Sequence, residues 1–315
     1  MAQALAPPLK PSGNAQVKIT PWAERRERAL WWGMAPALLL MATLTAAPIF
    51  FLWVTSLTPM NLAAPETIWN FSQPLSNYAA VFEDERLMHS VQVQLKLSIA
   101  SVVLQLGMGL AVALLLHTDT AVRSVARSAM LVPMVLPPIV VGITWLALLT
   151  PDISPLHRLL AALGMAVGPL LTNPDTALWA IVVASTWQHF PFAMLMALAA
   201  LQMVPESPIE AARIDGANGW QIFWHVRLPS IMPTLVVAGL FILIDSVKAF
   251  PLIYIMTDGG PGEVTEVTNY YAYRQVFTFS LWGYGSAIAT LMMAAIFIIT
   301  YVIYRMTQPA HSDAS

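Results

Sequence analysis

Long apolar stretches alternate with short polar ones along most of this 315-residue chain. A helix that spans a membrane needs about 20 apolar residues to cross a hydrocarbon core about 30 Å thick. Six stretches reach this length, at roughly Trp32–Leu57, Met88–Leu116, Val125–Leu149, Thr176–Val204, Ile231–Met256 and Leu281–Tyr304. The pattern therefore predicts an all-α membrane protein with six transmembrane helices.

The composition agrees with this prediction. The chain is 57% hydrophobic and only 10% charged, whereas soluble domains carry about 25% charged residues. A net charge of −2 gives no support for nucleic-acid binding, which needs a basic face. The chain has no cysteine, which excludes disulfides and thiolate metal ligands. The first apolar run, at about 25 residues, is too long for a signal-peptide core, so we interpret it as a retained anchor.

The basic residues predict the orientation. We expect a cytoplasmic N-terminal segment at 1–30, a transmembrane domain at 31–306 and a cytoplasmic tail at 307–315. Of the fifteen lysines and arginines, three fall in loops opposite the N-terminus, two fall within spans, and the rest share the side of the N-terminus. Because positive charge marks the cytoplasmic side, both termini are predicted to lie in the cytoplasm.

Prolines cluster in the third, fourth and fifth predicted spans, at Pro133, Pro137, Pro138, Pro191 and Pro251. Each leaves a backbone carbonyl without its helical donor, and a neighbouring helix or a water-filled path must satisfy that carbonyl. We therefore expect a cavity between these three spans.

Two loops on the side opposite the termini have local signals. Leu156–Gly168, "LHRLLAALGMAVG", is helical and moderately apolar but too short to span, so it predicts a surface or re-entrant helix. Thr257–Glu263, "TDGGPGE", predicts a chain-reversing turn after the fifth span.

A polar segment, Ser207–Pro229, separates the fourth and fifth spans. Ser207, Pro208 and Glu210 form a capping-box pattern that predicts a helix starting at Pro208. Gly216 and the pair Asn218–Gly219 end it, and a second short helix at Trp220–Val226 is expected to close at Pro229. A short helix tied to two spans is well suited to docking in a groove of another protein.

This segment, "EAARIDGANGWQIFWHVRLP", resembles the EAA loop of ABC-importer permeases. The matching positions are Glu210, Ala211, Ala212, Gly216, Val226, Leu228 and Pro229. The stretches "WQHFPF", "LAALQMVPESPIEAARIDGA", "YIMTDGGPGEVTEVTNYYAYRQVF" and "GYGSAIATLM" are similar to the sugar-permease branch, and specifically to its maltose-permease-like (MalF-type) members. The resemblance covers about residues 88–304.

The resemblance implies a type I (MetI-like) permease bundle with a cytoplasmic coupling helix in the loop 205–229. It implies the membrane subunit of a binding-protein-dependent importer for a sugar or related polyol. The implied partners are a second permease, two ATP-binding subunits and an extracytoplasmic solute-binding protein. The partner ATPase subunits would bind ATP and Mg, and this chain would bind no cofactor. Its sequence has no phosphate-binding Gly-x-x-x-x-Gly-Lys-Ser/Thr loop, so it is not expected to be an ATPase or another enzyme.

The resemblance also implies two sets of site residues. The expected ATPase-coupling set is Glu210, Ala211, Ala212, Asp215, Gly216, Leu228 and Pro229. The expected substrate-path set is Gln188, His189, Phe192, Asp245, Ser246, Lys248 and Ala249. Carboxylate, amide and imidazole groups beside an aromatic ring suit a polyhydroxyl ligand.

Simpler roles remain open for several of these residues. Glu210 would also serve as the third residue of its own capping box. Asp245 and Lys248, one turn apart in a span, would form either a self-neutralising pair or a polar path lining. Lys248 also keeps open a sugar-phosphate ligand such as glycerol phosphate, and an ion-driven secondary transporter is a further alternative. The six histidines are scattered, so no metal site is predicted.

Overall fold

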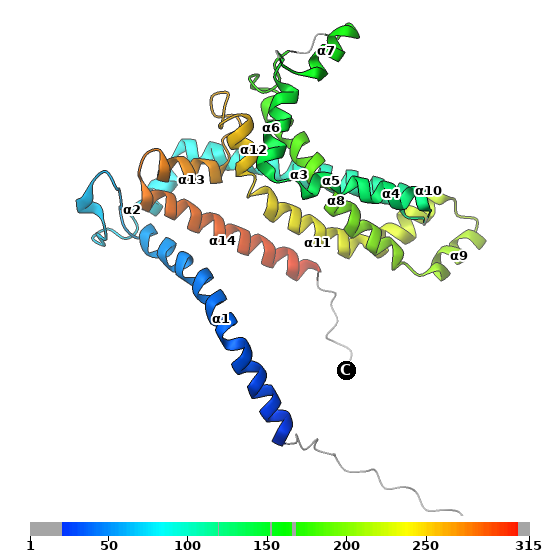
Figure 1. Cartoon of the computed structure of the whole chain (residues 1–315), viewed down its shortest axis with the longest axis horizontal. Helices are drawn as coiled ribbons and strands as arrows, with labels where there is room; N and C mark the ends of the chain where they lie inside the picture. The colour runs from blue at the N-terminus through cyan, green and yellow to red at the C-terminus, as the bar shows by residue number, and fades with distance from the viewer. Residues whose placement is uncertain (1–20, 119, 152, 166–167, 308–315) are drawn as a thin grey trace, which may run out of the picture. The chain divides into compact units, whose positions relative to one another are not determined.

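The structure is a computed structural model that describes residues 21–118, 120–151, 153–165 and 168–307 (Figure 1). Most of the predicted N-terminal segment and the predicted tail lie outside the described residues. Apart from isolated β-bridges of Asn61 with Ala64 and Leu281, the described part of the chain contains no β-structure. The chain divides into two compact units, Met1–Phe51 and Leu52–Ser315, which are described separately.

The first unit holds most of one long helix, α1 (Pro21–Ser56). Its membrane-spanning part, Ala29–Ser56, begins slightly before the predicted start at Trp32. From Leu30 to Phe51 every side chain except that of Ala35 is exposed. An exposed apolar helix is suited to contact with lipid or with another membrane subunit.

The second unit is a bundle of helices joined by short connections. The elements up to the end of the third predicted span are η1 (Pro65–Thr67), α2 (Ser76–Glu83), α3 (Glu85–Leu116), α4 (Ala121–Met130), α5 (Val132–Val135) and α6 (Pro138–Leu149). The remaining elements are α7 (Pro155–Ala162), α8 (Ala177–Gln202), α9 (Glu206–Ile214), α10 (Gly219–Ile222), η2 (Phe223–Arg227), α11 (Leu228–Ser246), α12 (Phe250–Met256), α13 (Thr268–Phe277) and α14 (Trp282–Thr307). In Figure 1, α9 lies at one end of this bundle and α13 at the other.

Six membrane spans were predicted, and the described residues contain five unbroken ones with a sixth made of two parts. The unbroken ones are Ala29–Ser56, Glu85–Leu116, Ala177–Gln202, Gly219–Ser246 and Trp282–Arg305. The sixth joins Ala121–Val135 to Pro138–Leu149 with a bend of 95°. The all-α fold class is confirmed.

The third predicted span, Val125–Leu149, was wrong as one continuous helix. It breaks at Leu136 and Pro137, whose ψ angles of 136° and 137° are extended. Two successive prolines cause the break, because a residue before proline avoids the helical region. The carbonyl of Leu136 is satisfied from α8, where the Gln188 amide Nε2 donates to it at 3.1 Å.

The fifth predicted span, Ile231–Met256, was also wrong as one helix. It ends at Ser246, and α12 starts a new helix at Phe250. Pro251 has no N–H to give to the carbonyl of Val247, four residues earlier. The Asn269 amide Nδ2 from α13 donates to that carbonyl instead, at 2.7 Å. The expectation that neighbouring helices satisfy such freed carbonyls is confirmed here.

The short helix predicted at Trp220–Val226 does not close at Pro229. The helix that starts at Gly219 continues to Ser246, through the π-helical turn η2. In that turn the N–H of Leu228 bonds to the carbonyl of Phe223, five residues earlier. The wider turn leaves room for the Pro229 ring, which would otherwise meet the carbonyl of His225.

Glycines set the closest approaches between helices. A Cβ on Gly109 of α3 would lie 2.5 Å from the Cβ of Ala193 of α8, so these two spans cross in direct backbone contact. Within the stretch "GYGSA", a Cβ on Gly283 would overlap the carbonyl oxygen of Thr58, so no side chain fits there.

The two predicted loop features are both present. Pro155–Ala162 forms the short helix α7, and Ser154 caps it by accepting from the N–H of His157 at 3.1 Å. The turn after α12 reverses the chain through residues with positive φ, among them Asp258 at 50° and Gly259 at 83°.

Candidate functional site

Two predicted substrate-path residues from different spans meet in the structure. His189 Nε2 of α8 lies 3.5 Å from Asp245 Oδ2 of α11. Both side chains are accessible, at 28% and 53% exposure, and His189 Nδ1 lies 3.1 Å from the carbonyl oxygen of Ser185. Close by in sequence, Phe192 packs edge-on against Phe241 at a centroid distance of 6.0 Å. The pair combines a carboxylate and an imidazole that remain open to a polar ligand.

Two other members of the predicted path are buried and hydrogen-bonded. Gln188 is 2% exposed, and its Nε2 holds the carbonyl of Leu136 at the break of the third span. Ser246 is 5% exposed and donates to Ser98 Oγ of α3 at 2.7 Å. These contacts give both residues a structural task, and their role in substrate contact stays a prediction.

Lys248 and Ala249 lie in the non-helical break between α11 and α12. The expectation that Asp245 and Lys248 share one helix face was therefore wrong, since the helix ends at Ser246. The side chain of Lys248 is exposed, and the imidazole that lies beside Asp245 belongs to His189. A cation is thus presented at the break, separate from the Asp245 carboxylate.

A buried polar stripe on α3 was missed in the sequence. Ser90, Gln94, Ser98, Ser101 and Gln105 are all at most 8% exposed. Gln94 Nε2 donates to Ser98 Oγ at 3.1 Å, and Gln105 Nε2 donates to Ser185 Oγ of α8 at 3.3 Å. Their spacing of three and four residues puts them on one helix face. Small polar residues at that spacing in a span are the signal that predicts a helix interface.

The predicted coupling helix exists, but its N-terminus differs from the prediction. α9 begins at Glu206 after Pro205, with no side-chain cap. Ser207 and Glu210 are therefore both inside the helix, and the predicted capping box between them was wrong. A capping box does occur later, between Asn218 and Gln221 at the start of α10. Glu210 is exposed and has no capping task.

The C-terminus of α9 is as predicted. Gly216 has φ +81°, and its N–H bonds to the carbonyl of Arg213 at 3.1 Å. The N–H of Ala217 bonds to the carbonyl of Ala212 at 2.9 Å. These two bonds form a Schellman motif, which fixes the direction in which the chain leaves the helix.

The predicted coupling residues are mostly accessible. Glu210, Ala211, Asp215, Gly216 and Pro229 are exposed, while Ala212 and Leu228 are half-buried. A groove of about 270 Å³ lies between α9 and the start of the next helix, with Ala212, Asp215 and Gly216 in its lining. The segment thus offers an acidic, shallow surface to another protein.

A charged cluster at the other end of the bundle was not foreseen. The Glu266 carboxylate, 2% exposed, accepts from Arg86 Nε at 2.8 Å and from Arg274 at 3.1 Å. Arg86 also contacts the more exposed Glu263 at 3.1 Å. The cluster ties the start of α3 to α13 and to the loop between α12 and α13.

Asp84 lies next to this cluster and caps α3. Its carboxylate accepts from the N–H groups of Arg86 and Leu87 and from the hydroxyls of Tyr271 and Tyr284. Burial alone raises the pKa of Asp84, but these four hydrogen bonds outweigh it and hold the pKa below its ordinary value of 3.8. The group is therefore a carboxylate at neutral pH.

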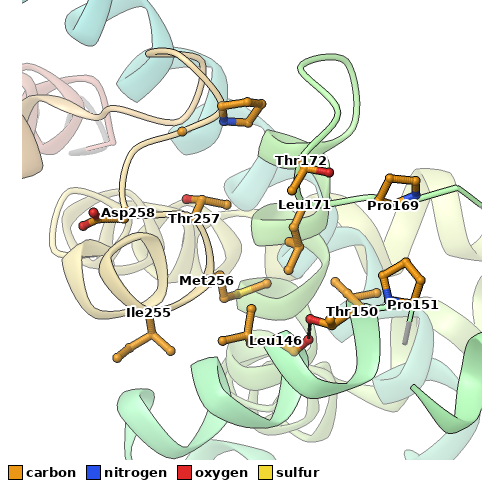
Figure 2. Close-up of a pocket in the computed structure, with 13 residues that line it drawn as sticks. Leu146, Thr150, Pro151, Pro169, Leu171, Thr172, Ile255, Met256, Thr257 and Asp258 are labelled. Carbon is orange, nitrogen blue, oxygen red and sulfur yellow. Dashed lines mark hydrogen bonds between the residues drawn. The ribbon is translucent and has the colours of Figure 1, made fainter. Parts of the chain in front are cut away.

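A cavity of about 370 Å³ lies between the end of α6, the segment 169–172 and the turn after α12 (Figure 2). This cavity touches the ends of the third and fifth predicted spans but no residue of the fourth, so the cavity expected between these three spans stays a prediction. Thr150, Thr172, Thr257 and Asp258 give the observed cavity a polar share. Its lining contains none of the clustered prolines and none of the predicted path residues. Among the described residues, no three His, Asp or Glu side chains gather in a group that could hold a metal ion.

The sequence of this chain matches a known protein family. The sequence matches the family of inner membrane components of binding-protein-dependent transport systems over residues 105–312. The chain belongs to this family. The matched range contains every predicted coupling and substrate-path residue of the permease.

The chain is similar to permeases of carbohydrate and sugar-phosphate transport systems within this family. The permease is 33% identical to the trehalose transport system permease protein SugA of Mycobacterium tuberculosis over 274 residues, 87% of this chain and 86% of that one. It is 32% identical to the sn-glycerol-3-phosphate transport system permease protein UgpA of Brucella abortus over 284 residues, 87% of this chain and 94% of that one. These relationships confirm the predicted family.

The fold has a solved counterpart. The permease superposes on a chain of a bacterial ABC transporter involved in the import of the acidic polysaccharide alginate with a TM-score of 0.78. The match covers 92% of this chain and 99% of that chain at 19% identity, so it concerns the fold alone. The predicted type I importer permease bundle is confirmed, and the apolar spans make the permease a multi-pass membrane protein.

Proposed function

We propose that this permease is the membrane subunit of an ATP-driven, binding-protein-dependent importer for a sugar or related polyol. The observation that carries the proposal is the contact of 3.5 Å between His189 and Asp245. The resemblance placed these two residues in the substrate path from separate motifs in two spans, and both keep accessible polar atoms. The trehalose permease among the relatives favours a carbohydrate ligand.

The energy would come from partner subunits. We infer that two ATP-binding subunits carry ATP and Mg and dock on α9, with Glu210, Ala211, Ala212, Asp215, Gly216, Leu228 and Pro229 as the coupling surface. The exposed Glu210 and the groove beside it support this inference, because Glu210 has no capping role that would explain it. An arginine on the ATPase subunit would form a charge-assisted contact with it.

The assembly would contain a second permease and an extracytoplasmic solute-binding protein. We place both termini and α9 in the cytoplasm of a bacterial cell, which puts α7, α12 and α13 at the outer side. The distribution of lysine and arginine supports this orientation. Alternating access would then connect the outer side to the His189–Asp245 pair.

A sugar phosphate is the second candidate substrate. The exposed Lys248 at the break between α11 and α12 would attract a phosphate, and the glycerol-3-phosphate permease among the relatives favours this class. A neutral sugar carries no negative charge that would pair with Lys248.

The test is uptake into proteoliposomes that hold the permease with its partner permease, ATPase subunits and solute-binding protein. We expect uptake of trehalose or maltose that requires ATP, and Asp245→Asn should raise the KM while the complex stays assembled. Uptake of glycerol 3-phosphate that Lys248→Met abolishes would support the second candidate. Unchanged kinetics in Asp245→Asn would remove Asp245 from the path, and uptake without ATP would defeat the proposed function.

A further inference from the structure

Aromatic rings form a continuous row on α12, α13 and the start of α14. Phe250 stacks on Tyr254 at a centroid distance of 5.5 Å, and it contacts Tyr273 at 4.8 Å. Tyr273 contacts Phe277 at 4.9 Å, and Phe277 contacts Trp282 at 5.9 Å. We refer to these five residues as the aromatic row.

The row is open to the surroundings of the chain. Tyr254 is 46% exposed and Phe277 is 65% exposed, and the other three rings are half-buried. Rings needed only for the core would be covered, as Tyr270 beside the row is, at 3% exposure with its hydroxyl bonded to Asp258. The row therefore presents ring faces that the core does not use.

The backbone beneath the row is held firmly. Asn269 of α13 donates to the carbonyl of Val247 at 2.7 Å, and Arg274 of α13 pairs with the buried Glu266 at 3.1 Å. Because α13 is fixed at both of these points, the rings on its open side keep their spacing. A pre-organised surface loses less entropy when a ligand binds it.

The row begins where the predicted substrate path ends. Phe250 directly follows Lys248 and Ala249 at the break after α11. From there the rings continue along α12 and α13 to Trp282, at the end of the bundle that holds the Glu266 cluster. A ligand bound at the Phe250 end of the row would therefore lie close to the polar groups at the break.

Ring faces combined with polar groups suit one ligand chemistry. The C–H faces of a pyranose ring pack on aromatic faces, and its hydroxyls need hydrogen-bonding groups at the edge. Tyr254 and Tyr273 each supply a phenol group beside an open ring. Tyr and Trp also anchor helices at membrane interfaces, but that role does not require the ring-to-ring contacts that join these five residues.

We propose that the aromatic row is an outer stacking site for saccharides with more than one pyranose ring, which guides them to the break at Lys248. This proposal rests on the proposed function and names its substrate class more closely. Acyclic polyols and glycerol phosphate have no pyranose face, so the row should not bind them.

The lack of cysteine makes the site directly measurable, because a single introduced cysteine has no background. We would introduce Tyr254→Cys and Phe277→Cys separately into the full chain, expressed with its partner subunits in right-side-out vesicles. Leu159→Cys on α7 is the matched control, since it is 60% exposed and distant in sequence from the row. The measurement is the rate of labelling by a membrane-impermeant maleimide.

We expect saturating maltose or trehalose to slow labelling at both row positions by at least about threefold, as burial under a stacked ring requires. Sorbitol and glycerol 3-phosphate should have no effect, and Leu159→Cys should label equally under all conditions. Equal labelling with and without the two disaccharides would overturn the proposal. So would protection by sorbitol, or labelling that occurs in detergent but not in vesicles, which would show that lipid or another subunit covers the row.

Uptake separates the two sites. Tyr273→Leu removes a ring face, so it should raise the KM for the transported disaccharide by about three- to tenfold with unchanged kcat, and Tyr273→Phe should restore most of the loss. If ATP-dependent disaccharide uptake occurs but the disaccharide does not protect the row cysteines from labelling, only the stacking-site proposal is refuted. Failure of any carbohydrate to be taken up would sink the proposed function and the row with it.

Discussion

Glu266→Gln tests whether the buried charge cluster holds the start of α3 to α13 and to the loop that precedes α13. In the wild-type chain the Glu266 carboxylate is 2% exposed and bonds Arg86 and Arg274 at 2.8 and 3.1 Å. Glutamine has the same shape but no charge, and its NH₂ group faces donors. The change therefore removes the negative charge and one of the two carboxylate oxygens that accept from Arg86 and Arg274.

The expected cost follows from burial. Breaking a fully buried ion pair by removing one partner costs about 3–5 kcal/mol. Arg86 and Arg274 are 35% and 30% exposed, so solvent partly screens the charges that remain, and we expect a cost of about 2–3 kcal/mol. Glu263→Gln is the matched control, since it removes a second acid from the same Arg86. That pair has side-chain exposures of 42% and 35%, so its loss should cost about 0–1 kcal/mol.

The assay is thermal unfolding of the full chain in detergent. At about 2 °C per kcal/mol for a chain of this size, Glu266→Gln should lower Tm by about 4–6 °C and Glu263→Gln by no more than about 2 °C. High salt should shrink only the effect of Glu263→Gln, because exposed pairs are screened. Equal shifts for the two variants would refute the argument from burial.

Three further predictions concern other parts of the permease. Glu210→Gln should leave Tm unchanged but weaken retention of the ATPase subunit during purification, more so as salt rises, since a desolvated charge contact is worth about 2–5 kcal/mol; normal subunit ratios would contradict it. Asp84→Asn keeps the α3 cap but loses the charge, so it should lower Tm at pH 7. Because the folded pKa of Asp84 is lowered, wild type should lose this advantage as the pH falls below 3.8 and the two Tm values should converge. Gly109→Val should lower stability by about 1–3 kcal/mol through overlap with Ala193, whereas Gly107→Val, with nothing within 4 Å of the added Cβ, should only show the smaller propensity effect.

The sequence predicts the number of spans and the position of α9 well. Span length depends on apolar composition alone, and the end of α9 at Gly216 depends on a residue that tolerates φ +81°. The start of α9 was wrong, because the Ser207–Glu210 pattern also fits the second and fifth positions of a helix that begins at Glu206. The local pattern of residues therefore does not determine at which residue the helix begins.

The helix breaks and the site contacts required the tertiary structure. Pro137 and Pro251 mark where breaks are possible, but the donors that stabilise them, Gln188 and Asn269, come from other helices. The contact between His189 and Asp245 depends on how α8 and α11 cross. Glu263 and Glu266 look alike in the sequence, and only packing makes one exposed and the other buried.

The helix breaks before α6 and before α12 limit how far a displacement at α9 would be carried along a continuous helix. An unbroken helix transmits an axial push like a rod, but a rod ends where its ladder of hydrogen bonds ends. The long helix that follows α9 ends at Ser246. The next helix, α12, packs on α6 where Ile255 faces Gly142. The short helices α6 and α12 are therefore tied to each other by packing, and the amides of Gln188 and Asn269 hold the backbone where each begins. We expect these two helices to be displaced as one unit, because neither continues the hydrogen-bond ladder of the long helix before it.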